Sequence, residues 1–219
     1  MKIVSEIKYL LKKEILLEWR SKYALNGILL YVVATVFVCY LSFRTTPPLV
    51  WNALFWIILL FAAINAISKS FVQESKGRLL YYYQIASPQA IIIAKIIYNI
   101  LLMILMSVIA LAFYSIVFQN EVGDKPLYFV AVILGAISFS SVFTMISAIA
   151  SKANNNGTLM AILSFPVIIP VLMLIIKLSK NAMDGLDRSV SLDEIGVLTA
   201  INLIVITVSL LLFPYLWRD

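Results

Sequence analysis

The sequence predicts an all-α membrane protein with six transmembrane helices, preceded by a helix that lies on the membrane surface. Two observations carry this prediction. The first is a set of six long apolar stretches, at 25–43, 49–67, 91–118, 127–150, 158–177 and 196–216. A helix needs about 20 apolar residues to cross a bilayer core about 30 Å thick. The second is composition: 63% of the 219 residues are hydrophobic and 13% are charged, too little polar surface to cover a soluble domain.

The amino-terminal residues 1–23 form the predicted interfacial helix, because apolar and basic side chains separate at helical spacing. The apolar side holds Ile3, Val4, Ile7, Leu10, Leu11, Ile15 and Leu17, and the basic side holds Lys2, Lys12, Lys13 and Arg20. Glu14 and Glu18 interrupt the apolar side. Two interpretations stay open: a simple interfacial anchor, or a helix whose two carboxylates meet a partner subunit. The apolar stretch that follows is long enough to act as its own signal anchor.

The first two spans are predicted to form an antiparallel hairpin, because only residues 44–48 separate them. Thr46 is expected to cap the second span, with Pro47 at its first helical position. Ser87-Pro88 is a start signal for the third span. Ser191 and Glu194 have the spacing of a capping box for the sixth.

The longest inner connection, residues 68–90, is the predicted coupling segment. Gly77 can end one short helix, and 78–85 can form another. This second helix would expose leucines and tyrosines, which favours a partner surface, although tyrosines pressed into lipid headgroups explain the pattern equally well. The residues assigned to the coupling segment are Glu74, Gly77, Arg78, Leu79, Leu80, Tyr82 and Tyr83.

Two further segments are candidate sites. Pro166 and Pro170 interrupt the fifth span, and two prolines four residues apart bend a helix. They predict either a packing kink or a flexible element near a substrate path. The external loop 178–194 carries four acidic residues, but their spacing matches no calcium-binding loop, so we expect a solvated loop.

The distribution of charge predicts that both termini are cytoplasmic. If the spans alternate from a cytoplasmic amino terminus, twelve of the seventeen basic residues lie in cytoplasmic segments and five lie outside. Basic residues mark the cytoplasmic side of short loops. The net charge of +6 is therefore assigned to topology and contact with membrane lipids, and nucleic-acid binding is not expected.

Several kinds of chemistry are excluded by the sequence. The chain has no histidine and one cysteine, Cys39, within the first span, where it is expected to be a packing residue. The longest polar stretch is too short to bury its own core, so one transmembrane domain over residues 1–219 is expected. The sequence contains no phosphate-binding loop, nucleophile elbow or metal-ligand cluster, and no span carries Asp or Glu at mid-depth, as ion-coupled carriers do. We expect no catalytic residue, no metal site and no directly bound cofactor. Any energy used must enter from another chain.

Two stretches carry a family resemblance. One runs from Gln73 through Ser87-Pro88 to Lys95. The other runs from Lys152 through Leu163-Ser164-Phe165-Pro166 and Pro170-Val171-Leu172 to Asp184. Together with the six-span plan, they resemble the heme exporter protein B family, the CcmB subunit of the cytochrome c maturation system. The resemblance covers essentially the whole chain, and the double-proline span is its most specific part.

The resemblance implies an ABC type-2 exporter-like membrane domain in the bacterial inner membrane. It implies a non-catalytic permease subunit that pairs with a soluble ATPase, the A component, beside the heme-handling C component and a small D component. By analogy with ABC transporters we expect a homodimer. Heme would be a transported or handled ligand, since release of the heme-loaded chaperone is what the system supports.

Two alternatives stay open at this point. The chain could be a membrane scaffold that docks the ATPase and the heme-handling subunit without transporting anything. It could also be an ABC type-2 exporter of another lipophilic substrate. Without histidine, the usual strong axial ligand for heme iron is missing, so no heme-contact residue is assigned.

Overall fold

The computed structural model describes residues 2–21, 23–43, 46–68, 70–71, 86–118, 122–151 and 156–218. Every regular element in these ranges is helical, which confirms the all-α prediction. The elements are α1 (Lys2–Ser21), α2 (Tyr23–Ser42), α3 (Pro48–Ile67), α5 (Pro88–Val117), α6 (Lys125–Ala150), α7 (Asn156–Met183), a short 3₁₀ helix η1 (Arg188–Ser191) and α8 (Leu192–Arg218).

Within the described residues, five helices are long and apolar enough to cross a membrane: α3, α5, α6, α7 and α8. They correspond to the second to sixth predicted spans. The first predicted span corresponds to α2, whose apolar part, Asn26–Ser42, is shorter than these five. The chain is therefore a multi-pass helical membrane protein, and the count of six spans stays a prediction.

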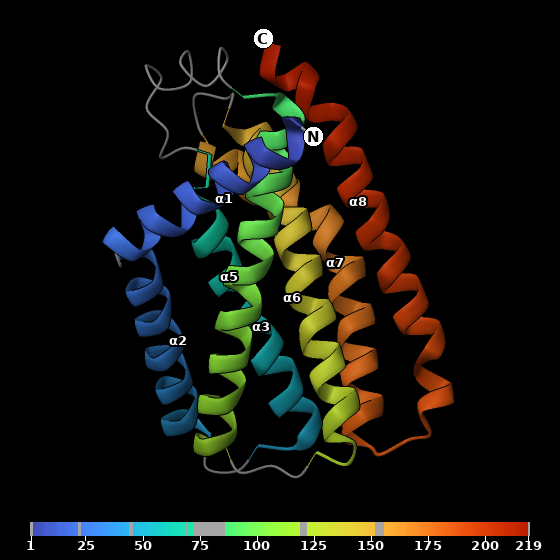
Figure 1. Cartoon of the computed structure of the whole chain (residues 1–219). Coiled ribbons are helices and arrows are strands. Elements are labelled where there is room, and N and C mark those ends of the chain that lie inside the picture. The colour runs from blue at the N-terminus through green and yellow to red at the C-terminus, as the bar shows by residue number, and fades with distance from the viewer. Residues whose placement is uncertain are drawn as a thin grey trace.

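The helices form an up-and-down bundle, with α1 lying across one end (Figure 1). Both chain termini lie at this end, which we call the N/C end. The connections α2–α3, α5–α6 and α7–α8 lie at the opposite end, which we call the turn end. The α2–α3 hairpin agrees with the prediction from its short connection. In α6, buried residues recur along the whole helix, because α6 packs against α3, α5, α7 and α8.

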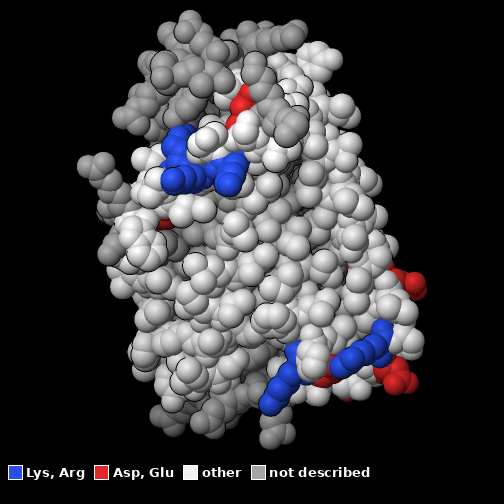
Figure 2. Space-filling view, in the orientation of Figure 1, with Lys and Arg blue, Asp and Glu red and all other residues white. Residues whose placement is uncertain are grey.

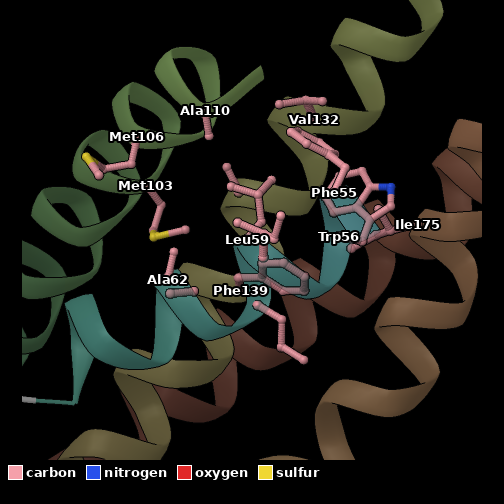
Figure 3. Close-up of a cluster of buried hydrophobic side chains, with 14 of the residues drawn as sticks. Phe55, Trp56, Leu59, Ala62, Met103, Met106, Ala110, Val132, Phe139 and Ile175 are labelled. Carbon is pink, nitrogen blue, oxygen red and sulfur yellow. The ribbon is translucent and has the colours of Figure 1, made fainter. Parts of the chain in front are cut away.

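In the core of the bundle, aromatic side chains of α3 pack with aliphatic and aromatic side chains of the neighbouring helices (Figure 3). Trp51 and Phe55 stack at 6.3 Å between ring centroids, and Trp56 meets Phe139 edge to face at 6.1 Å. Gly135 of α6 makes this packing possible, because a Cβ at that position would lie 2.5 Å from Cζ3 of Trp56. In lipid, such close contacts hold helices together where the hydrophobic effect no longer drives helix association.

Polar side chains join three helices beside this cluster. Asn52 of α3 donates to Oγ of Ser179 on α7 at 2.9 Å, and Trp56 Nε1 donates to the same oxygen at 2.8 Å. Tyr128 of α6 donates to Oδ1 of Asn52 at 3.2 Å. A buried amide in a membrane bundle needs such partners, and Asn52 therefore fixes the register of α3, α6 and α7.

Helix boundaries differ from the prediction at two places. The cap of α3 is Pro47, without a side-chain hydrogen bond, and Pro48 is the first helical residue, so the predicted Thr46 cap is wrong. The predicted loop 178–194 is shorter, because α7 continues to Met183 and α8 begins at Leu192.

Candidate functional site

The coupling residues that the sequence singled out, Glu74, Gly77, Arg78, Leu79, Leu80, Tyr82 and Tyr83, lie outside the described residues. Their assignment stays a prediction. The two flanks of this segment are described: residues 68 and 70–71 after α3, and residues 86–87 before α5. Both flanks are held by polar contacts at the N/C end of the bundle. We call these contacts the flank cluster.

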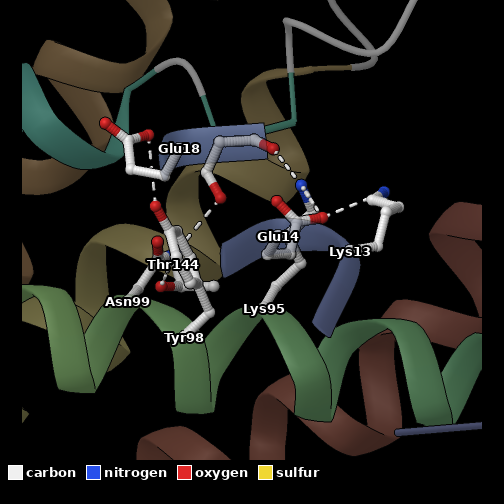
Figure 4. Close-up of polar contacts among 8 residues, drawn as sticks. Lys13, Glu14, Glu18, Lys95, Tyr98, Asn99 and Thr144 are labelled. Carbon is white, nitrogen blue, oxygen red and sulfur yellow. Dashed lines mark hydrogen bonds and ion pairs between the residues drawn. The ribbon is translucent and has the colours of Figure 1, made fainter. Parts of the chain in front are cut away.

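Lys95 of α5 holds the first flank (Figure 4). Its side chain is 5% exposed and forms an ion pair with Oε1 of Glu14 on α1 at 3.1 Å. Nζ also donates to the backbone oxygen of Ser70 at 2.5 Å and lies 5.4 Å from the ring centre of Phe71. A buried ammonium requires an opposite charge and hydrogen-bond acceptors. Lys95 therefore holds together α1, α5 and Ser70 of the first flank.

Amide and hydroxyl groups reinforce this flank. Asn99, one turn after Lys95, donates to Oγ of Ser70 at 3.2 Å and to Oγ1 of Thr144 on α6 at 2.9 Å. Ser147 of α6 donates to the backbone oxygen of Ser68 at 3.4 Å. Because these donors come from both α5 and α6, a displacement of the first flank would pull on two spans.

Glu6 of α1 holds the second flank. Its Oε2 accepts hydrogen bonds from the backbone N–H of Ser87 at 3.0 Å and from the Ser87 hydroxyl at 2.7 Å. Ser87 is the N-cap of α5, with Pro88 as the first helical residue, which confirms the predicted start of this helix. The Ser87 side chain itself makes no capping bond. A carboxylate from another helix accepts from the N-cap residue itself, where its negative charge meets the positive end of the helix dipole.

The acidic residues of α1 all face the bundle. Glu18 accepts a hydrogen bond from the Tyr98 hydroxyl at 3.2 Å, so Glu6, Glu14 and Glu18 each contact α5 or its cap. Within the chain, Glu14 contacts Lys95 and Glu18 contacts Tyr98, and the alternative that these two carboxylates meet a partner subunit stays a prediction. Both contacts are with α5, the third predicted span.

Sequence reasoning missed Glu6 and Lys95 as site residues. It used Lys95 among the basic residues that indicate topology and as the end of one resemblance stretch. A signal was present: Lys95 lies among apolar residues two turns after the helix start, and Glu14 interrupts the apolar side of α1. Two opposite charges at apolar positions can be read as a buried pair, but the sequence does not show that they meet.

The predicted kink residues are both in the structure, and α7 is assigned as one helix through Pro166 and Pro170. Both prolines are exposed on the surface of this single chain, whereas Ser164 and Ile168 on the same helix are buried. The structure thus places them on the outside of the bundle, away from the flank cluster. Their role near a substrate path stays a prediction.

At the turn end, charged residues join the connections between helices. Asp124 accepts from Arg188 Nε at 2.7 Å and Nη2 at 3.2 Å, and from the backbone N–H of Leu127 at 3.0 Å. Lys177 of α7 pairs with Glu194 of α8 at 2.7 Å. The predicted capping box is wrong: Glu194 faces Lys177, and Ser191 accepts from Asn181 at 3.2 Å.

Acid should weaken the turn end through Asp124. The hydrogen bond from Arg188 and the backbone bond from Leu127 hold the pKa of Asp124 below its usual range. A lowered pKa stabilises the fold above the unfolded value of about 3.9, and this contribution is lost as pH falls through the folded value. Asp124→Asn is therefore expected to melt at a lower temperature than the native chain at pH 7, with a smaller difference at about pH 3, below the unfolded value. Melting curves in detergent at both pH values check this. A difference that grows on acidification would contradict it.

The described residues offer no group of three or more His, Cys, Asp or Glu side chains that could hold a metal ion. The polar contacts of the flank cluster include the Ser87 hydroxyl, which donates to the Glu6 carboxylate at 2.7 Å. Together, these ion pairs and hydrogen bonds fix the two flanks of the connection between α3 and α5 to several helices.

Bundle and flank cluster together define a multi-pass membrane protein whose N/C-end connection is anchored to its spans. The chain belongs to the CcmB protein family, whose model matches residues 5–214. It is accordingly a membrane subunit of the heme exporter system for cytochrome c maturation. A search of curated proteins found no match.

Proposed function

We propose that this chain is the permease subunit that couples ATP hydrolysis on a soluble partner to the heme export system, and that the ATPase engages the segment between α3 and α5. The observation that carries the proposal is the flank cluster. Lys95 and Asn99 hold Ser70, and Glu6 holds Ser87. A partner that moves the segment between these flanks would act on a rigid attachment.

The contacts of the two flanks define how a movement of the segment between α3 and α5 would reach the spans. The first flank is bonded to α5 through Lys95 and to α6 through Ser147. The second flank is the start of α5 itself. Because α5 is a continuous 30-residue helix, a push at its N-terminus would reach the turn end without passing through a flexible joint. Rigid elements with packed contacts are the structures that transmit such changes.

The proposed setting is the bacterial inner membrane, with both termini in the cytoplasm. Both termini lie at one end of the bundle (Figure 1), and under the six-span topology twelve of the seventeen basic residues belong to that side. The proposed partners are the ATPase A component, the heme-handling C component and the small D component. A single six-span half needs a second half to flank a path, so we propose a homodimer with two ATPase subunits.

The test uses carboxylates placed in the coupling segment. Leu79→Asp or Tyr82→Asp would put a charge into the proposed apolar contact and cost about 2–4 kcal/mol of binding. We expect normal membrane abundance, loss of the co-purifying ATPase in mild detergent, and loss of cytochrome c maturation. Asn155→Asp in the other connection on that side is the matched control and should retain all three.

Native mass spectrometry of the purified complex measures how many copies of this chain it contains, and two copies are expected. One copy of this chain per complex would contradict the homodimer. If the Asp variants retain the ATPase and mature cytochromes normally, the segment is only a membrane-surface helix and the coupling assignment is wrong.

A further inference from the structure

Helix α1 has two faces of opposite charge. Glu6, Glu14 and Glu18 face the bundle and are engaged there. Lys8 and Lys12 are exposed on the other face. None of the three acidic residues of α1 is among its exposed residues, so its outward charge is positive. Figure 2 shows a group of basic side chains on the surface over α1.

The outward face also carries large apolar and aromatic side chains. Tyr9 and Trp19 are each 74% exposed, and Leu16 is 56% exposed. Trp and Tyr favour the boundary between hydrocarbon and water, where an apolar ring and a polar edge are both satisfied. Lysine beside them can extend its ammonium to the headgroups while its methylene stem stays in the apolar layer.

The position of α1 fits the same boundary. The helix crosses the outside of α5 at the N/C end (Figure 1). There α3 ends at Ile67 and the apolar bundle gives way to polar connections. This is the level at which phospholipid headgroups meet a membrane protein.

We propose that the outward face of α1 binds the headgroups of anionic phospholipids, through Lys8 and Lys12, with Leu16 and Trp19 set against the upper part of the acyl chains. A protein partner fits this face less well, because the centres of protein interfaces are depleted in lysine. An anionic lipid supplies phosphate for the two ammonium groups and hydrocarbon for the apolar side chains.

The inward contacts prepare this face for binding. The ion pair with Lys95 and the bonds to Ser87 and Tyr98 fix the rotation of α1 about its axis. Lys8 and Lys12 are therefore presented outward before lipid arrives, and binding costs less ordering entropy. The inference depends on the geometry of α1 and not on the proposed ATP coupling.

The test measures lipid selectivity of the full chain. The purified protein is placed in nanodiscs with equal phosphatidylglycerol and phosphatidylcholine, and the retained lipids are counted by native mass spectrometry. The native chain should retain phosphatidylglycerol preferentially. Each basic residue near a membrane surface contributes a factor of about five to anionic lipid binding. Lys8→Gln/Lys12→Gln should therefore lower the preference about 25-fold.

The matched control is Lys125→Gln/Lys180→Gln, which removes two exposed lysines from the turn end. It should retain the preference, and Lys8→Arg/Lys12→Arg should retain it as well. The inference is overturned if the Lys8/Lys12 variant keeps the native preference, or if the control loses it equally, since that would show a response to net charge alone. Loss of a co-purifying protein with unchanged lipid counts would assign the face to a protein partner and also overturn it.

Discussion

Lys95→Met is expected to lower the stability of the detergent-purified protein by about 3 kcal/mol, because removing one partner of a buried ion pair leaves the other charge without compensation. Among the contacts of the described residues, Glu14 would keep the one with its neighbour Lys13, at 3.0 Å, and the carbonyl of Ser70 would lose the Lys95 donor. For a chain of this length the melting temperature should fall by roughly 6–12 °C. Thermal melting followed by size-exclusion chromatography measures this.

A second variant separates stability from coupling. Lys95→Met/Glu14→Leu replaces the pair by apolar side chains, an exchange that is often neutral for stability. It should restore the melting temperature, while cytochrome c maturation stays low because Ser70 is no longer tied to α5 through an ammonium group. Lys180→Met, at an exposed lysine of α7, is the matched control and should melt like the native chain. Native-like melting of Lys95→Met would show that the pair contributes no stability.

Gly135→Val should prevent accumulation of folded protein. Its side chain would begin with a Cβ 2.5 Å from Cζ3 and 2.6 Å from Cη2 of Trp56. Trp56 cannot move away, because its ring is fully buried and its Nε1 is bonded to Ser179. Gly135→Ala should cost about 1–3 kcal/mol, the usual range for an overfilled core. The yield of monodisperse protein from membranes and its melting temperature measure both effects.

Rescue and control make this prediction specific. Trp56→Phe removes both clashing atoms, so Gly135→Ala/Trp56→Phe should melt above Gly135→Ala. Gly196→Ala in α8 is the matched control, because no atom lies within 4 Å of its added Cβ. It should leave stability unchanged or raise it by about 0.5–1 kcal/mol. Equal losses at both glycines would point to helix backbone effects and refute the packing argument.

The sequence predicted the second to sixth spans well, since spanning length is a local property. Whether a stretch such as 127–150 enters a bilayer depends on the summed transfer energy of its own residues, and α6 (Lys125–Ala150) agrees closely. The start of α5 at Pro88 was also predictable, because proline at a first helical position acts through its own fixed φ.

Predictions that needed partners distant in the sequence were less successful. The capping box at Ser191 and Glu194 has the right spacing, yet Glu194 forms an ion pair with Lys177 instead. A charged donor binds a carboxylate more strongly than a neutral backbone N–H does. At the start of α5, the backbone N–H of Ser87 donates to Glu6, which lies on another helix. Spacing rules predict hydrogen bonds within one segment, but a charged side chain from another helix can form a stronger contact and replace them.

The sequence by itself determined that this chain is a helical membrane protein, which stretches are long and apolar enough to span, and that α1 is amphipathic. Only the tertiary structure decided which face of α1 packs against the bundle. It also decided that Lys95 is buried, paired with Glu14 and bonded to the carbonyl of Ser70, rather than exposed at the surface. The physical reason is range. Partitioning into lipid and helix periodicity are summed over neighbouring residues, whereas a buried ion pair exists only where the packing of separate helices brings its two charges together.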